Sequence, residues 1–137
     1  MSCDMQRLLI CRYLWVGDVM SKSEHYRQDE IRLELSKYGL VFRTNAGSAW
    51  GGKYTNLPNI GNVIIKPRRI ELLPKGFSDL LFVGTDGRVA FVECKDDEGA
   101  LRPEQEKFLK LMQSYGHRAG IARSVEDALE IIGVKKL

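Results

Sequence analysis

Apolar residues in the first part of the chain follow a helical period and then give way to short runs typical of strands. Between Ser23 and Gly39 they recur at i, i+4 and i+7, at positions Ile31, Leu35 and Tyr38. This spacing predicts an amphipathic helix that ends at a glycine C-cap. Residues 40–42 predict a short strand, and the glycine-rich residues 45–52 predict a loop after it.

The clearest local structure in the sequence is a β-hairpin. Residues 80–83 and 89–94 are apolar and rich in β-prone residues, and the Asp-Gly pair within residues 85–87 is typical of a tight turn between two strands. Upstream, residues 62–66 predict a further strand, and a basic connector bracketed by prolines follows over residues 67–74. We therefore expect two neighbouring strands of a sheet at the hairpin.

Two helices and one strand are expected after the hairpin. Pro103 suits the first turn of a helix that Gly116 ends. Residues 118–123 predict a strand, and Ser124 with Asp127 three positions later forms a capping box for the last helix. The order of elements predicts an α/β domain with a central mixed β-sheet flanked by helices.

Composition narrows the class of protein. The chain has 137 residues, of which 44% are hydrophobic and 28% charged, and its formal net charge is +3. These values indicate one globular domain and argue against a disordered, collagenous or coiled-coil chain. No stretch has the roughly 20 uninterrupted apolar residues that a membrane span needs. The three cysteines are an odd number without a C-x-x-C pair, which favours a reducing, cytoplasmic setting.

The first residues stand apart from this pattern. We expect a folded domain over residues 23–137, after an N-terminal extension of residues 1–22. Arg12 interrupts the apolar run of residues 8–16, so we expect no signal peptide. Met20 directly precedes the first predicted helix, and translation that starts there is a hypothesis.

Candidate chemistry gathers at the predicted hairpin. Side chains alternate across a strand, so Phe91, Glu93 and Lys95 share one face. The tight turn would bring Asp79, which opens the preceding strand, to the same edge. Two nearby carboxylates repel each other, and a hard divalent cation relieves that repulsion. An isolated E-x-K is usually an ordinary ion pair on a solvated face, but its place after a buried strand and the Asp79 partner favour a site for phosphodiester hydrolysis.

Four motifs, in this order and spacing, resemble those of the VRR-NUC nucleases, a branch of the PD-(D/E)xK restriction-endonuclease-like superfamily. They are Gly-Phe-Ser-Asp-Leu-Leu at 76–81, Phe-Val-Glu-Cys-Lys at 91–95, Pro-Glu-Gln at 103–105 and Ala-Arg-Ser-Val-Glu-Asp at 122–127. The resemblance covers about Ser23 to Ile132. One departure is Ser78, which stands where proline is usual; because that proline sets a turn and is no ligand, we expect the serine to be tolerated.

The resemblance implies a restriction-endonuclease-like core over residues 23–137 that cleaves DNA with Mg²⁺ or Mn²⁺. Asp79, Glu93 and the backbone carbonyl of Cys94 would be metal ligands. Lys95 would be the catalytic lysine, and Gln105 a further polar residue on the helix behind the site.

The first predicted helix supplies another site residue in such families, and three candidates remain open. Gln28 shares the core-facing stripe of the helix and is favoured. Glu24, one turn earlier on the same face, is second. Glu30 points elsewhere and is third. The alternative for each is a solvated helix residue.

The segment from residue 41 to residue 76 is basic, with six Lys and Arg side chains against Glu71 alone. Trp50 is interleaved with them and would stack on an unpaired base. Many basic loops are merely solvated, but beside a nuclease motif contact with DNA phosphates is the favoured interpretation. The expected DNA-binding residues are Arg43, Asn45, Lys53, Tyr54, Lys66, Arg68, Arg69 and Lys75.

The remaining chemically versatile side chains are given no catalytic role. His25 and His117 lack metal-ligand spacing and are expected at the surface. The Cys94 side chain faces away from Glu93 and Lys95 and is expected in the core.

Small stand-alone members of this family resemble Holliday junction resolvases, which act as homodimers on branched DNA, and suggest by analogy a bacterial or phage-infected host cell. We therefore expect a structure-specific endonuclease of that kind in the cytoplasm. A flap-type or non-specific DNA nuclease is the alternative enzyme. A catalytically inactive DNA-binding module is the alternative from another class.

Overall fold

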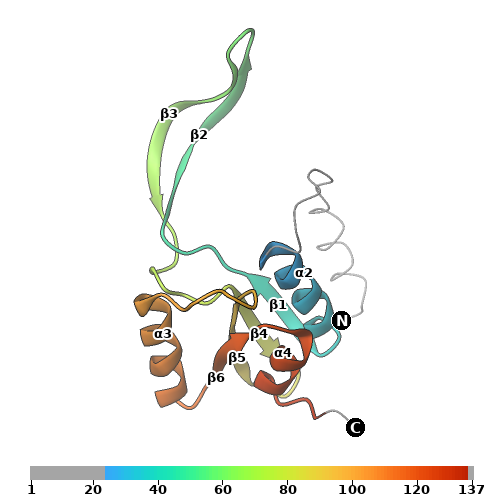
Figure 1. Cartoon of the computed structure of the whole chain (residues 1–137). Coiled ribbons are helices and arrows are strands. Elements are labelled where there is room, and N and C mark those ends of the chain that lie inside the picture. The colour runs from blue at the N-terminus through green and yellow to red at the C-terminus, as the bar shows by residue number, and fades with distance from the viewer. Residues whose placement is uncertain (1–23, 136–137) are drawn as a thin grey trace.

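A computed structural model of the protein describes residues 24–135 as a four-stranded mixed sheet, a separate two-stranded hairpin and three helices (Figure 1). The elements in chain order are α2 (Glu24–Leu35), β1 (Gly39–Arg43), β2 (Ser48–Leu57), β3 (Gly61–Glu71), β4 (Leu80–Gly84), β5 (Val89–Cys94), α3 (Pro103–Ser114), β6 (Arg118–Ala122) and α4 (Val125–Ile131). The predicted α/β fold with a mixed sheet is confirmed. The expected extension over residues 1–22, with Met20, lies outside the described residues.

The hairpin predicted from the Asp-Gly turn forms the centre of the main sheet. β4 and β5 pair antiparallel with Leu80 opposite Val92, and Gly87 takes a positive φ of 78° in the turn. β1 pairs antiparallel with β4, and β6 pairs parallel with β5, so the strand order is β1-β4-β5-β6. The start of β4 and the end of β5 therefore lie side by side at one end of the sheet.

The core lies on both faces of this sheet. On one face α2 and α4 pack against the strands, and Ile31, Leu35 and Ala128 are fully buried there together with Leu80 and Val92. Figure 1 shows α3 on the opposite side of the sheet from α4. Burying one such aliphatic side chain contributes about 1.5–3 kcal/mol, so this layer holds the end of α2 firmly against β5.

An aromatic cluster joins α3 to the other face. Phe108 on α3 lies 5.4 Å from Phe91 on β5 and 4.6 Å from Phe77, measured between ring centroids. These contacts fix the start of α3 beside the end of β5.

The end of the first helix differs from the prediction. α2 ends at Leu35, Tyr38 is partly exposed, and Gly39 is the first residue of β1. The expected glycine C-cap is wrong, because Gly39 does not take a positive φ. A Cβ at this position would lie 2.3 Å from the Val83 carbonyl oxygen, so glycine is needed for the close approach of β1 and β4.

The predicted glycine-rich loop and much of the predicted basic connector are also wrong. Residues 48–57 and 61–71 are paired antiparallel strands, with a bulge opposite Gly52 and a positive φ of 50° at Lys66. A Cβ on Gly52 would lie 2.8 Å from the Ile65 carbonyl oxygen on β3, so this glycine allows the two strands to approach closely. Pro67 is tolerated within β3 because both strands of a two-stranded ribbon are edges.

We call β2 and β3, residues 48–71, the hairpin arm. Figure 1 shows the arm extending away from the sheet and the helices. At its base, the Gly47 N–H donates to the Leu73 carbonyl at 2.8 Å and Ala46 forms a parallel bridge with Leu73. A two-stranded hairpin by itself is only marginally stable in water, so this arm is a candidate for contact with another molecule.

The last helix begins as predicted, with one difference. The Ser124 hydroxyl accepts the Asp127 N–H at 3.1 Å, which confirms Ser124 as the N-cap. The Asp127 carboxylate accepts the N–H of Arg123 at 2.9 Å, one residue earlier than a capping box requires. Gly116, with a positive φ of 84°, follows the end of α3 as expected. None of the helices in residues 24–135 is both long and apolar enough to cross a membrane.

Candidate active site

The structure brings Asp79, Glu93 and Lys95 together where β4 begins and β5 ends. One Asp79 carboxylate oxygen accepts the N–H of Cys94, the residue between Glu93 and Lys95, at 2.9 Å. Lys95 Nζ lies 2.9 Å from Glu93 Oε1. The antiparallel pairing of β4 and β5 produces this convergence, since it places the first residue of one strand beside the last residue of the other.

The turn before β4 is held in place from two sides. Gly76 takes a positive φ of 89°, and a Cβ there would lie 2.5 Å from the Glu104 carbonyl oxygen at the start of α3. Ser78 is fully buried, and its hydroxyl donates to the Leu80 carbonyl at 3.2 Å. Directly after β1, the Thr44 N–H donates to the Asp79 carbonyl at 2.9 Å. The Asp79 side chain is thus presented by a turn with little freedom.

Glu93 is the most buried acidic group of the site, with no exposed surface. Its Oε1 atom accepts hydrogen bonds from Lys95 Nζ and from Gln105 Nε2. Its Oε2 atom is buried and has no hydrogen-bond partner among residues 24–135. An unpaired buried carboxylate oxygen costs free energy unless a cation or a proton satisfies it.

The pKa shifts of the two carboxyl groups also indicate that a nearby positive charge would stabilise their ionised forms. Burial, and next the charge of Asp79, raise the pKa of Glu93 to about 7 although Lys95 opposes the shift. Burial also raises the pKa of Asp79, against the Cys94 N–H and the Lys95 charge. Burial acts to lower the pKa of Lys95, but the bond to Glu93 and its charge outweigh that effect, so the pKa is raised. Lys95 therefore remains an ammonium at neutral pH.

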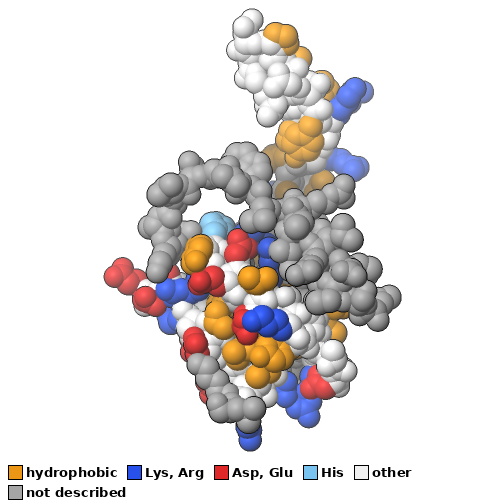
Figure 2. Space-filling view, turned by 90° about the vertical axis from the view of Figure 1, so that its right-hand side faces the viewer, with side chains coloured by type: hydrophobic (Ala, Val, Ile, Leu, Met, Phe, Trp, Pro, Cys, Tyr) orange, Lys and Arg blue, Asp and Glu red, His pale blue; other side chains and the backbone are white. Residues whose placement is uncertain are grey.

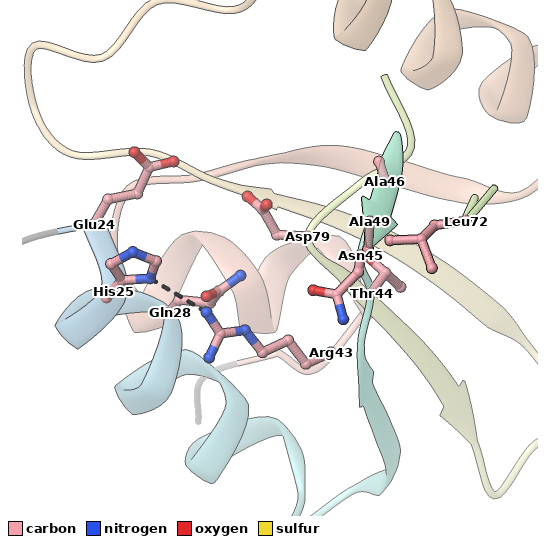
Figure 3. A pocket seen from close by; sticks show the side chains of 10 residues that line it. All are labelled: Glu24, His25, Gln28, Arg43, Thr44, Asn45, Ala46, Ala49, Leu72 and Asp79. Atoms are coloured by element: carbon pink, nitrogen blue, oxygen red, sulfur yellow. Dashed lines mark hydrogen bonds between the residues drawn. The ribbon is translucent and has the colours of Figure 1, made fainter. Parts of the chain in front are cut away.

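Two of the three candidates on α2 lie at the site. Glu24 Oε1 lies 3.3 Å from Lys95 Nζ. Glu24 and Gln28 line a pocket of about 430 Å³ together with Asp79 (Figure 3). Glu30 contacts Tyr26 instead and is not part of the pocket. The helical stripe correctly placed Gln28 and Glu24 on one face, but the Glu24–Lys95 ion pair depends on how α2 packs on β5, which no local pattern reports.

Gln105 links α3 to the carboxylates. It is the third residue of the helix; its Oε1 atom accepts the N–H of Arg102 at 2.9 Å, and its Nε2 atom donates to Glu93 Oε1. One side chain thus satisfies the helix N-terminus and orients Glu93. Because Gln105 acts through Glu93, it is a positioning residue.

Replacing Gln105 by alanine is expected to lower the free energy of unfolding by about 1–2 kcal/mol, since one capping bond and one bond to a buried carboxylate are lost. Chemical denaturation would measure this. Gln113→Ala is the matched control, because Gln113 donates to the Ala119 carbonyl at 2.8 Å at the far end of the same helix. We expect a rise in KM for the activating metal in Gln105→Ala alone; equal KM values in both variants would contradict the positioning role.

The expected DNA-binding residues are divided between the pocket and the hairpin arm. Arg43 and Asn45 line the pocket, and Lys75 is exposed in the turn before Gly76. Figure 2 shows Lys and Arg side chains with apolar side chains along the arm. The residues on the arm are Lys53, Tyr54, Lys66, Arg68 and Arg69, and all of them are exposed.

The two histidines and Cys94 lie as predicted. His25 and His117 are exposed, and His25 Nδ1 lies 3.3 Å from the Arg43 guanidinium. Cys94 is fully buried in the core. Burial and the Asp79 charge raise the pKa of the Cys94 thiol, so it is protonated and unsuited to act as a nucleophile.

Comparison with known protein families matches residues 22–126, more than half of the chain, to the VRR-NUC domain. Comparison with curated proteins gives no match. The matched residues include Asp79, Glu93, Lys95 and Gln105.

Proposed function

The chain belongs to the VRR-NUC family of PD-(D/E)xK nucleases, which implies DNA nuclease activity, and from this premise we propose that it is a metal-dependent, structure-specific endonuclease that resolves Holliday junctions as a homodimer. The observation that carries the proposal is the buried Glu93–Lys95 pair with Asp79 bonded to the backbone between them.

The residues at the site fit a divalent cation such as Mg²⁺ or Mn²⁺, which nucleases of this superfamily generally use. Asp79, Glu93 and the Cys94 carbonyl would hold it. The Oε2 atom of Glu93 has no hydrogen-bond partner among residues 24–135 and is therefore available as a metal ligand. Among residues 24–135 no three His, Cys, Asp or Glu side chains form a complete metal cluster. The two carboxylates Asp79 and Glu93 suit Mg²⁺, which usually takes one or two carboxylates and keeps several waters. When bound, the cation would polarise the phosphoryl oxygen and lower the pKa of a water.

Lys95 has a distinct role in this proposal. Lys95 as a whole is 8% exposed, and its ammonium group is held between Glu93 and Glu24 at the end of the sheet where the phosphate would bind. A fixed ammonium there stabilises negative charge that develops on the phosphoryl group and orients the attacking water. Glu24 holds Lys95 in this position, and so we assign it, ahead of Gln28, as a positioning residue of the site.

The hairpin arm supplies contacts to the DNA backbone. Residues that pair across two antiparallel strands share a face, so Arg68 lies on the same face as its partner Gly51. Lys53 follows Gly51 by two residues on β2 and lies on that face as well. Trp50 and Tyr54 lie on the other face and suit stacking on bases. Neither Lys53 nor Arg68 has a carboxylate partner among residues 24–135. Both are free to bind phosphates.

The double variant Lys53→Ala/Arg68→Ala is expected to bind duplex DNA more weakly and to reduce the slope of log K against log salt by about 2, or about 1 for each lost phosphate contact. Fluorescence anisotropy at several salt concentrations measures both. Lys37→Ala/Arg88→Ala is the charge-matched control at the opposite end of the sheet from Asp79. Equal slopes for the two double variants would contradict DNA binding by the arm.

The homodimer is proposed because two symmetric nicks across a junction need two sites. β1 is an edge strand of the main sheet, and Leu40 and Phe42 on it are 46% and 48% exposed. Two apolar side chains on one face of an edge strand suit an interface in which the same surface of two copies meets. The proposed setting is the reducing cytoplasm, where the buried Cys94 stays a thiol.

The substrate preference is tested with labelled four-way junctions, flaps, linear duplex and single strands, each incubated with Mg²⁺, Mn²⁺ or EDTA. We expect paired symmetric nicks in the junction, only with metal, and a dimer in sedimentation experiments. Cleavage mainly of flaps or single strands, or a monomer with and without junction DNA, would contradict the resolvase assignment. Binding without cleavage of any substrate would point to an inactive DNA-binding module.

A further inference from the structure

The pocket beside Asp79 has two chemically different walls. Figure 3 shows Glu24, His25 and Gln28 of α2 on one side, and the apolar residues Ala46, Ala49 and Leu72 at the base of the hairpin arm on the other. These three apolar residues are all exposed. The volume of about 430 Å³ lies in the range of small-molecule sites, about 300–1,000 Å³.

Gln28 is the second, independent feature of the pocket. Its side chain is 6% exposed, yet among residues 24–135 its amide group has no hydrogen-bond partner. Its amide atoms are not among the fully buried side-chain atoms without a partner, so the amide is accessible in the pocket, and its donor and acceptor pair matches the edge of a nucleobase. Asn45 presents a second amide on the opposite wall.

Arg43 gives the pocket a cationic end. Its guanidinium lies beside His25 and has no carboxylate partner among the described residues, whereas Glu24 and Asp79 line the other end. A DNA strand whose scissile phosphate lies at Asp79 would therefore meet Arg43 with a neighbouring phosphate.

We propose that this pocket holds one unstacked nucleotide next to the scissile phosphate, with its base against Ala46, Ala49 and Leu72 and its edge bonded to Gln28 and Asn45. This inference rests on the proposed nuclease function and specifies its substrate: the nucleotide beside the cleaved bond must leave the base stack. Extruding a base from intact duplex costs a few kcal/mol and costs least where the base is already unpaired, as at a branch point. The pocket thus gives a physical reason for preferring branched DNA.

The test uses 2-aminopurine placed at one position at a time along the strand of a four-way junction, with the full chain in EDTA so that no cleavage occurs. Stacking quenches 2-aminopurine, and the lining that residues 24–135 give the pocket contains no Trp, Tyr or Phe to quench it. We expect the fluorescence to rise at one position, adjoining the bond that a parallel reaction with Mg²⁺ cleaves.

Two variants connect this signal to the pocket. Gln28→Met removes the amide with little change of volume, and Asn45→Ala alters only an exposed residue and so avoids any disturbance of the core. Both are expected to lose the signal and to bind the junction roughly tenfold more weakly. An abasic nucleotide at the responding position should weaken wild-type binding by a similar factor and Gln28→Met binding no further. Gln113→Met, on the far end of α3, is the matched control and should keep the signal.

Binding of the junction, seen by anisotropy, without a fluorescence rise at any position would overturn the pocket inference, as would a rise that survives in both variants. Neither result contradicts the proposed nuclease activity, because cleavage is measured separately on the same junctions with Mg²⁺. Conversely, a rise that requires Gln28 and Asn45 in a protein that cleaves nothing would support the pocket and contradict the enzyme.

Discussion

Lys95→Met is expected to lower the rate of DNA cleavage by about 10²–10³-fold, because a preorganised charge aimed at a developing anion contributes about that much. Lys95 Nζ is held 2.9 Å from Glu93 Oε1 and 3.3 Å from Glu24 Oε1, so its position is set before any substrate binds. Lys95→Arg should not restore the rate, since a planar guanidinium is not interchangeable with a compact ammonium at a buried site.

Lys110→Met is the matched control for this variant. Lys110 Nζ lies 2.6 Å from Glu106 Oε1, but that ion pair is exposed on α3 and contributes little. Single-turnover rates on a labelled junction, with thermal unfolding to verify that each variant folds, provide the measurement. If Lys95→Met and Lys110→Met cleave at the same rate, Lys95 has no role in the reaction.

Glu93→Gln is expected to abolish cleavage and, at the same time, to stabilise the metal-free protein above neutral pH. The folded-state pKa of Glu93 is about 7, above its ordinary value of 4.5, so the folded protein binds the proton more tightly than the unfolded chain does. The contribution of Glu93 to the stability of the wild type is therefore greatest below pH 4.5, falls as the pH rises toward 7 and then levels off. This fall should reach up to about 3 kcal/mol, which is the free-energy equivalent of the pKa difference.

Glutamine removes the titration while it keeps an oxygen to accept the bonds from Lys95 and Gln105. Denaturant unfolding between pH 5 and pH 8 in EDTA would therefore show a steeper loss of stability in the wild type than in Glu93→Gln. Added Mg²⁺ should raise the melting temperature of the wild type alone, since a ligand that binds the folded state stabilises it. Parallel pH profiles for the two proteins would contradict the unfavourable ionisation of Glu93.

The central part of the fold was predictable from local signals, and the arm was not. The Asp-Gly turn fixed the β4–β5 hairpin, and residue alternation then placed Glu93 and Lys95 on one face. In contrast, Gly51 and Gly52 suggested a loop, yet they lie in β2 because this segment pairs with β3, whose backbone at Ile65 approaches Gly52 closely. Such cross-strand packing is set by a partner more than ten residues away, which no local pattern reports.

In the candidate site, too, some residues could be placed from local sequence patterns and others could not. Asp79 was placed beside Glu93 by the geometry of one hairpin, whereas the choice between Gln28 and Glu24 depended on the docking of α2 against the end of β5. Both side chains lie on the face expected from the helical period. Only the packed structure distinguishes Glu24, paired with Lys95, from Gln28, whose amide is left free in the pocket.

The most direct test of the proposed metal-dependent site compares junction cleavage by the wild type, Asp79→Asn and Asp86→Asn, each with Mg²⁺ and with EDTA. Asp86 is a suitable control because it also accepts a backbone N–H, that of Arg88 at 3.0 Å, but at the far end of the hairpin. We predict that the wild type and Asp86→Asn cleave only with Mg²⁺, and that Asp79→Asn, although folded, is slower by about 10³-fold. Cleavage by Asp79→Asn at the wild-type rate, or by the wild type in EDTA, would contradict the account.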